Sequence, residues 1–429
     1  MLIRLFIISL VSITSFLANA AGFSFSGVNK SVVAIGADKS SGLEAVYVAP
    51  TTSGLSVTFT PDNPGDEIVW YSFGPEGAAY AEQIATGATL TGLTSDRGYA
   101  AEVGNRRTYF WLIDYSLHPF LPQNITPNPA ESDCGTIELN FDGRADRLNY
   151  YAVTGRRIDI DREIELKYFT LEAEESSFIQ REKTVTLPYI SSVIHAPSPL
   201  CSTRFTLSGD RFLKEWKETK SISTDAVTPT SVSAVTTVKT ENREIANEQT
   251  DGTSDEIGGS APVTINFTAK VTDAVVFTEW QLATDSEMQQ ITLRERSTDW
   301  TYTFTDAGSF YVRFVAANAD GSCQWESDIY RVGIGESRLR CPNAFSPGTS
   351  EGVNDVWCVS YRSIIEFDCT IFNRWGVKIT HLSDPSQGWD GKYKGKLVDP
   401  GVYYYVIKAR GADGKDYNLS GDINIIGKR

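Results

Sequence analysis

Apolar and polar residues alternate one by one along much of this chain. Residues 55–60, 136–141, 164–168 and 263–268 each follow this pattern. Strict alternation places one face of a β-strand against a core and the other face in water. Short turn sequences such as Asn-Ala-Asp-Gly at 318–321 separate the runs, whereas windows with the 3.6-residue period of a helix are scarce. The pattern therefore predicts an all-β chain built of antiparallel β-sandwiches.

Changes in composition divide the 429 residues into several predicted domains. Four prolines near 119–129 mark the end of the first sandwich, and a later segment is rich in Ser, Thr, Asn, Asp and Glu. Within that polar segment the β-branched residues 231–238 still predict a strand. The predicted division is a signal peptide at 1–20, β-sandwich domains at 21–128 and 129–222, a linker with a strand at 223–260, a third sandwich at 261–337 and a C-terminal domain at 338–429.

The first twenty residues have the order of features found in a secretory signal peptide. Arg4 precedes an apolar run over 5–17, and Ala18-Asn19-Ala20 follows as a small-residue cleavage site. We therefore predict export by the secretory route. Further along, no stretch reaches the roughly 18 uninterrupted apolar residues of a membrane-spanning helix, so none is expected in the mature chain.

Six cysteines follow the predicted signal peptide, and an even number in an exported chain predicts disulfides. Six cysteines allow about 15 pairings, which sequence alone cannot distinguish. Cys134 and Cys201 fall in one predicted domain, so we favour that pair, while the other four lie between 323 and 369. The spacings do not fit a structural zinc site.

The formal net charge of −15 is concentrated in the first part of the chain. Residues 341–429 contain 11 Lys and Arg against 10 Asp and Glu, so the acidic excess lies before them. This acidic excess argues against binding to nucleic acid or to anionic membrane surfaces, because Lys and Arg favour both kinds of binding. The acidity itself is explained most simply by solubility outside the cell.

The third predicted domain combines a Trp-containing strand with a later alternating strand. The sequence Phe277-Thr278-Glu279-Trp280 is followed by an alternating run at 308–315 and a turn at 318–323. These features resemble a PKD-type Ig-like domain, although residues 281–284 depart from the acidic, Gly-rich turn usual in that family. With the alternation elsewhere, the expected architecture is a row of tandem Ig-like or fibronectin-like β-sandwich domains ending in a C-terminal β-sandwich.

The C-terminal segment contains several motif blocks in a fixed order. They lie at 341–347, 352–355, 370–376, 388–395 and 400–406. In this order they resemble the gliding-motility-associated C-terminal domain, the type B sorting signal of the type IX secretion system of Bacteroidota. The residues that carry the resemblance are Pro342, Asn343, Phe345, Asn354, Asp355, Phe372, Asn373, Arg374, Trp375, Gly376, Trp389, Asp390, Gly391, Gly401 and Tyr403. Residues 348–352 lack the Asn-Gly-Asp-Gly turn often found there, which weakens any calcium site at this turn.

The resemblance implies a route and partners for the chain. The protein is expected to pass through the periplasm and the outer membrane, by way of the type IX translocon and, for this type of signal, a dedicated outer-membrane barrel partner. It is then expected at the cell surface or outside the cell. Within this domain Trp375 and Trp389 each adjoin a turn, and we favour buried packing over a recognition role for both. Lys392, Lys394 and Lys396 alternate, which would place a basic stripe on one side of a strand, either for an acidic partner or as a solvated edge.

Residues for catalysis are sparse. The three histidines, His118, His195 and His381, are far apart in sequence, and no phosphate-binding Gly-x-x-x-x-Gly-Lys sequence occurs. The acidic loop at 251–256 has the ligand type for calcium but reads more simply as solvated. Trp70, Trp111, Trp280 and Trp300 lie in strand-like runs and are expected in cores rather than on a glycan-binding surface.

We therefore predict no catalytic, cofactor-binding or metal-binding residues and no enzyme activity. The leading hypothesis is a secreted or cell-surface protein for adhesion, with an unidentified protein or glycan ligand. A structural subunit of a surface or secretion-linked assembly is the first alternative, and a glycan-binding module is the second. An exposed row of Trp or Tyr would favour the glycan-binding module.

Overall fold

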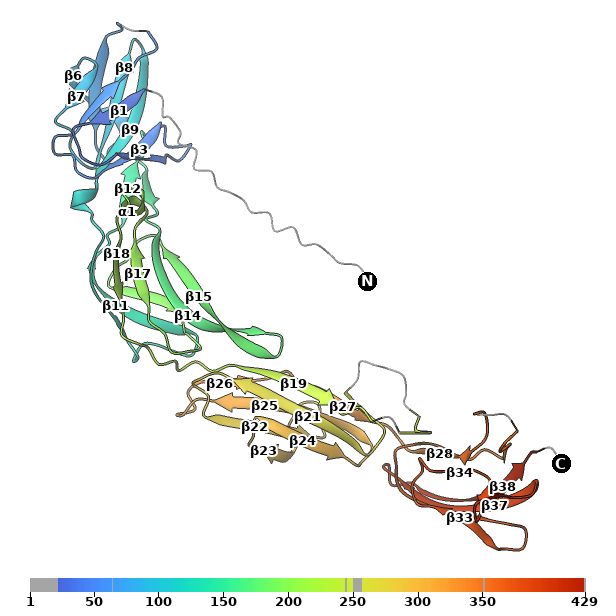
Figure 1. Cartoon of the computed structure of the whole chain (residues 1–429). Coiled ribbons are helices and arrows are strands. Elements are labelled where there is room, and N and C mark those ends of the chain that lie inside the picture. The colour runs from blue at the N-terminus through green and yellow to red at the C-terminus, as the bar shows by residue number, and fades with distance from the viewer. Residues whose placement is uncertain (1–21, 64, 244, 250–256, 350–351, 428–429) are drawn as a thin grey trace.

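The computed structural model describes residues 22–427 except 64, 244, 250–256 and 350–351. The predicted signal peptide and the acidic loop at 251–256 lie outside the described residues. The described chain is all-β, as predicted, and forms four sandwich units in a curved row from the N-terminal to the C-terminal end (Figure 1). No helix in the described part of the chain is long and apolar enough to cross a membrane.

The first unit packs a small sheet on a large one. Its small sheet has the order β1-β4-β7, and its large sheet has the order β2-β3-β9-β8-β5-β6. Alternating residues of both sheets, with Trp70 and Phe110 fully buried, fill the core between them. The strands are β1 (Phe23–Ser26), β2 (Val33–Gly36), β3 (Ala45–Ala49), β4 (Ser56–Phe59), β5 (Ile68–Phe73), β6 (Glu82–Thr86), β7 (Thr89–Thr91), β8 (Arg97–Val103) and β9 (Arg106–Asp114), with the 3₁₀ turn η1 (Ala78–Tyr80).

The second unit has one sheet with the order β10-β11-β16 and another with the order β15-β14-β17-β18. β10 pairs antiparallel with β11 and so lies in this unit's sheet, before the boundary predicted at residue 128. Strands β14 and β15 form a hairpin that extends beyond the sandwich (Figure 1). The elements are η2 (Tyr115–Leu117), β10 (Leu121–Pro127), β11 (Thr136–Arg144), β12 (Leu148–Tyr151), β13 (Arg157–Ile160), β14 (Ile164–Glu174), β15 (Ser177–Leu187), β16 (Val193–Pro197), β17 (Thr206–Gly209), α1 (Arg211–Glu215) and β18 (Lys220–Ser223).

A continuous core joins the first two units. One cluster of buried apolar side chains contains Val48, Trp111 and Ile113 from the first unit and Leu139 and Leu166 from the second. Because the apolar surface at this junction is buried between the units, separating them would expose it to water. The two sandwiches are therefore expected to behave as one rigid body.

The third unit contains the strand expected in the polar segment. That strand is β19 (Ala234–Thr240), which pairs with β21 in the sheet β19-β21-β24. The opposite sheet has the order β20-β27-β25-β22-β23, and the short β26 pairs with the end of β25. The other strands are β20 (Ile257–Gly259), β21 (Val263–Val271), β22 (Phe277–Ala283), β23 (Ile291–Glu295), β24 (Asp299–Phe304), β25 (Gly308–Ala317), β26 (Gln324–Glu326) and β27 (Tyr330–Ile334). Trp280 and Trp300 are buried between the sheets, as expected.

The predicted disulfide between Cys134 and Cys201 is wrong. Cys134 is bonded to Cys323, so the bridge joins the second unit to the third across 189 residues of sequence. Cys134 lies in the loop before β11 that faces the third unit, whereas Cys201 is a buried free thiol beside Gln180. A groove of about 610 Å³ adjoins the bridge between the two units. The disulfide therefore constrains the relative positions of the second and third units, at a junction that side chains do not fill completely.

The C-terminal unit has a main sheet with the order β29-β38-β37-β32-β33. Strands β37 and β38 form the hairpin expected around Asp413-Gly414. A core that includes Trp357, Trp389 and Ile407 lies beneath the sheet. The strands are β28 (Arg338–Arg340), β29 (Ala344–Phe345), β30 (Trp357–Cys358), β31 (Ser360–Arg362), β32 (Ile364–Phe372), β33 (Lys378–Leu382), β34 (Gly388–Trp389), β35 (Lys392–Tyr393), β36 (Lys396–Leu397), β37 (Gly401–Gly411) and β38 (Asp416–Ile425).

Buried hydrogen bonds join the third unit to the C-terminal unit. Ser363 is fully buried at this junction. Its hydroxyl accepts a bond from the Ala261 amide at 3.1 Å and donates to the Gly335 carbonyl at 2.6 Å. Its carbonyl accepts from the Ala412 amide at 2.9 Å, and Ala412 belongs to the apolar core of the third unit. A polar side chain satisfied in this way holds the two units in one orientation.

Candidate docking surface of the C-terminal unit

Several residues of the predicted sorting motif build the core of the C-terminal unit. Phe345 and Trp389 are buried, with ring centroids 5.3 Å apart, and Tyr403 meets the other side of Trp389 at 5.2 Å. The carbonyl of Pro342 accepts a 2.7 Å hydrogen bond from the indole of buried Trp357. Aromatic side chains with satisfied polar groups contribute strongly to such a core. These motif residues therefore shape the domain from inside.

A second group of motif residues fixes the loops. The carboxylate of Asp355 accepts hydrogen bonds from the amides of Gly348 and Gly352, at 2.9 and 2.7 Å. Asn354, the preceding residue, has a left-handed backbone with φ of 56°. A carboxylate that accepts backbone amides fixes the positions of the residues that donate them, here Gly348 and Gly352. Asp355 of the motif thus has a structural role, in which backbone amides of the protein are its hydrogen-bond donors.

Other polar motif residues close tight turns and edges in the same way. The Asn343 carbonyl accepts the amide of Asn424 at 2.9 Å, which ties β29 to the end of β38. The Asp390 carboxylate accepts the amide of Lys392 at 3.0 Å, next to Gly391 with φ of 75°. Gly401 begins β37 with φ of 153°, in the half of backbone space that favours glycine.

The hairpin between β32 and β33 presents the exposed part of the motif. The side-chain oxygen of Asn373 accepts the amides of Trp375 and Val377, at 3.0 and 2.9 Å, and Gly376 has φ of 80°. This arrangement projects Trp375 into solvent with 72% of its surface exposed. The Arg374 guanidinium lies 4.2 Å from the Trp375 ring centroid, within the range of a cation–π contact.

The expectation that both tryptophans are buried is therefore correct for Trp389 and wrong for Trp375. Trp389 lies in a strand and is 2% exposed, whereas the Asn373 turn directs Trp375 away from the sheet. A ring of this size left in water is unusual, because aromatic side chains gain from burial. Its exposure makes it a candidate contact residue.

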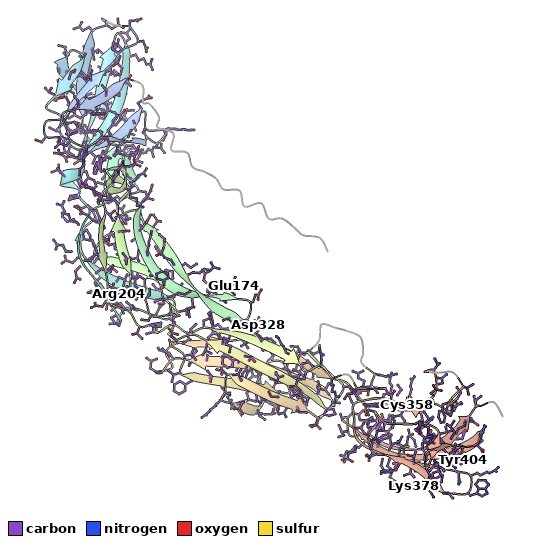
Figure 2. The ribbon with its side chains drawn as sticks, in the orientation of Figure 1. Glu174, Arg204, Asp328, Cys358, Lys378 and Tyr404 are labelled. Atoms are coloured by element: carbon purple, nitrogen blue, oxygen red, sulfur yellow. A yellow bond between two sulfur atoms is a disulfide. The ribbon has the colours of Figure 1, made fainter. Side chains whose placement is uncertain are left out.

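The outer face of the main sheet continues this exposed apolar surface. Side chains alternate across a strand, so Val402, Tyr404 and Val406 of β37 share the side opposite the core. Each is between 42% and 45% exposed. Phe372 is paired directly with Tyr404, and it lies one residue before the Asn373 turn. Figure 2 locates Tyr404 on the C-terminal unit. We name Phe372, Trp375, Val402, Tyr404 and Val406 the aromatic face.

The predicted basic stripe does not form. Lys392 and Lys396 lie on the two paired strands β35 and β36, and Lys394 and Gly395 make the two-residue turn between them. Both turn residues have left-handed backbones, with φ of 52° and 80°. Such a turn reverses the chain, so the three lysines cannot share one side of a single strand.

The histidines and free cysteines of the described residues are the remaining candidates for reactive chemistry. Each of the three histidines lies beside a single carboxylate: His118 beside Asp96, His195 beside Glu138 and His381 beside Asp368. Burial raises the pKa of the Cys369 thiol to about 12 and also raises those of Cys341 and Cys358, so these thiols stay protonated. Within the described ranges, no group of three or more His, Cys, Asp or Glu side chains is arranged to hold a metal ion.

These features define the C-terminal unit as a β-sandwich with an exposed aromatic face. Residues 339–425 match the CHU_C type IX secretion signal domain, and residues 126–224 match a fibronectin type III domain. The first match confirms the predicted sorting domain, and the second falls on the second sandwich. The signal implies export to the cell surface or extracellular space and interaction with the secretion machinery. The PKD-type resemblance at 261–337 stays a prediction.

Other comparisons add little. No curated protein matches the chain. Among solved structures, a tetra-tandem repeat from the extending region of a large adhesion protein is 13% identical, with coverage of 88% of this chain and 97% of that one and a TM-score of 0.21. Immunoglobulin domains 1–5 of Sidekick-1 are 11% identical, with coverage of 87% and 76% and a TM-score of 0.27. Likenesses at these scores carry no argument about function.

Proposed function

We propose that this chain is a non-enzymatic surface protein that the type IX secretion system exports, and that its three preceding sandwiches serve in adhesion. The observation that carries the proposal is the secretion signal match at 339–425 on a domain with an exposed aromatic face. Residues 1–20 would direct the first step across the inner membrane. The aromatic face would then dock on the translocon, or on its outer-membrane barrel partner, because burial of exposed aromatic side chains favours association.

The connections between units support a role in which the chain holds its N-terminal sandwich away from the cell surface. The first two units share a core, a disulfide joins the second to the third, and buried hydrogen bonds around Ser363 join the third to the C-terminal unit. Units connected by a shared core, a disulfide or buried hydrogen bonds change their relative orientation less than units connected by polar linkers. An elongated row attached by its C-terminal unit would carry its first sandwich away from the cell surface.

The alternative of a self-assembling structural subunit has weaker support. The most extended edge strand of the second unit, β15, is 11 residues long and would be the natural place for strand addition. Its outer part carries Arg181, Glu182 and Lys183, which are exposed. Charged side chains along an edge disfavour pairing with another chain. We therefore favour adhesion over assembly through this edge.

Export can be tested by locating the protein in cells of a Bacteroidota species that has this system. The intact chain should reach the surface or medium, whereas a chain without residues 338–429 should accumulate in the periplasm. Trp375→Ala combined with Tyr404→Ala should retain much of the protein in the periplasm while leaving its fold intact. Tyr80→Ala is the matched control, since Tyr80 is 70% exposed but lies in the first unit.

Two results would contradict the proposal. Surface delivery of the truncated chain would show that the C-terminal unit is dispensable for export. Normal delivery of the double variant would show that the aromatic face is not the docking surface. The sorting role of the C-terminal unit would still stand.

A further inference from the structure

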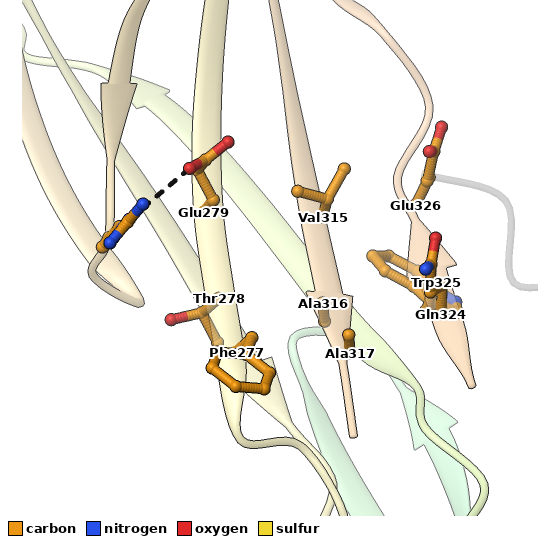
Figure 3. A pocket seen from close by; sticks show the side chains of 10 residues that line it. Phe277, Thr278, Glu279, Val315, Ala316, Ala317, Gln324, Trp325 and Glu326 are labelled. Atoms are coloured by element: carbon orange, nitrogen blue, oxygen red, sulfur yellow. Dashed lines mark ion pairs between the residues drawn. The ribbon is translucent and has the colours of Figure 1, made fainter. Parts of the chain in front are cut away.

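A groove of about 370 Å³ lies on the outer face of the third unit's larger sheet. Its floor is formed by Val315 and Ala317 of β25. Phe277 of β22 stands on one side, and Gln324 and Glu326 of β26 stand on the other (Figure 3). A volume of this size is within the range of small-molecule sites.

The strand register explains why the surface is hollow here. Ala317 pairs with Phe277 on one side and with Gln324 on the other, so the smallest side chain of the row is in the middle. The adjacent Ala316 and Trp325 pack with the core of the unit and also contribute to the lining of the groove. Phe277 is 58% exposed, although burial would normally be favoured for its ring.

Hydrogen bonds hold the polar side chains beside the groove in place. Gln281 donates to Glu279 at 2.8 Å and accepts from the Arg313 guanidinium at 2.9 Å, and Arg313 also donates to Glu326 at 2.9 Å. Arg294 donates to the other end of this chain, at Glu279. Planar polar groups fixed in advance lose little conformational entropy when a ligand binds.

The charges of this chain largely compensate one another. Burial alone would raise the pKa of Glu279, but hydrogen bonds from Gln281 and Arg294 and the positive charges of Arg294 and Arg296 outweigh it and lower the pKa. Glu279 is therefore ionised and paired with Arg294, and Glu326 lies within ion-pair distance of Arg313, at 2.9 Å. A site whose charges are internally paired has no strong attraction for a polyanion or a polycation.

We infer that this groove binds a sugar unit of an uncharged polysaccharide. A sugar ring has an apolar C–H face, which suits the exposed Phe277 ring, and a rim of hydroxyls, which suits planar amide, carboxylate and guanidinium groups. The amide of Gln324 and the carboxylate of Glu326 face Phe277 across the floor and can receive that rim.

Peptide occupants fit less well. An added β-strand needs a free sheet edge, but β22 and β26 pair with β25 along both sides of the floor. An amphipathic helix needs a long apolar groove, whereas Glu279 borders this one at one end (Figure 3), where it forms an ion pair with Arg296. The sugar proposal deepens the proposed adhesive role and rests on it for biological meaning.

The test uses the purified mature chain, residues 21–429, and isothermal titration with three neutral polysaccharides: laminarin, galactomannan and pullulan. At least one should bind, and Phe277→Ala should weaken that binding about tenfold or more, equivalent to the stacking of one ring. Gln324→Ala should also weaken it. Val276→Ala is the matched control, because Val276 is the adjacent exposed residue, at 59%, and does not line the groove.

The outcomes separate this inference from the proposed export. Absence of binding to all three polysaccharides, binding unaffected by Phe277→Ala, or preferential binding of heparin as a polyanion would each overturn the sugar site. Thermal unfolding of Phe277→Ala should be unchanged because the ring is mostly exposed, so a folding defect cannot imitate lost binding. Export is measured in cells and does not depend on this groove, so either proposal can fail alone.

Discussion

A fully buried ion pair at the junction of the first two units provides a quantitative test of how they are held together. Arg162 and Asp210 both have no exposed side-chain surface, and their closest approach is 2.6 Å. The Arg162 guanidinium also donates to the carbonyls of Asp146 and His118, at 2.9 and 3.0 Å. Tyr115, which follows the last strand of the first unit, donates its hydroxyl to Asp210 at 3.2 Å.

Arg162→Met removes the cation and keeps most of the side-chain volume. The Asp210 carboxylate then remains buried, with the Tyr115 hydroxyl and the Leu213 amide as its remaining donors. Removing one partner of a buried pair costs about 3–5 kcal/mol, because the other charge is left uncompensated. For a unit of roughly 150–250 residues, each kcal/mol lowers Tm by about 2–4 °C, so we expect a decrease of about 6–20 °C.

Calorimetry of the whole mature chain measures this change, and hydrogen exchange assigns the affected transition to the first two units. Because those units share a core, they should lose protection together. Arg181→Met is the control: its ion pair with Glu172 is 2.9 Å long, but its side chain is 53% exposed, so the expected cost is below about 1 kcal/mol.

Adding Asp210→Asn to Arg162→Met removes the stranded charge and should recover part of the loss. The reasoning is refuted if Arg162→Met costs less than about 1 kcal/mol, or if the effects of the two substitutions simply add.

Three further predictions concern other parts of the chain. Breaking the disulfide with Cys134→Ser and Cys323→Ser should widen the distribution of angles between the second and third units in small-angle scattering, with both sandwiches still folded. Trp357→Ala should destabilise the C-terminal unit by about 3–5 kcal/mol in denaturant unfolding, because the side chain is fully buried, whereas Trp375→Ala should cost less than about 0.5 kcal/mol. Burial alone would raise the pKa of Asp114, but hydrogen bonds from neighbouring Ser and Thr residues lower it from 3.8. Its stabilisation is present above pH 3.8 and lost as pH falls below that value, so Asp114→Asn should flatten the acid limb of a stability–pH profile.

The sequence by itself determined the local structure. Alternation at 136–141 and 263–268 predicted strands that exist as parts of β11 and β21, because the two-residue period directly reflects which face is buried. Trp70 and Trp111 were expected in cores on the same grounds, and both are buried. The ordered motif blocks at the C-terminal end identified the secretion signal, which needs no knowledge of how distant segments meet.

Only the tertiary structure decided which distant groups meet and which side chains stay outside. Cys134 pairs with Cys323 because a loop of one sandwich faces a loop of the next, and sequence distance does not encode that arrangement. Trp375 is exposed because the Asn373 turn directs it away from the sheet, although its residue type favours burial. The groove on the third unit depends on Ala317 standing between two longer side chains from paired strands. Strand pairing across long sequence separations is selected by packing of the whole sandwich, so local periodicity cannot specify it.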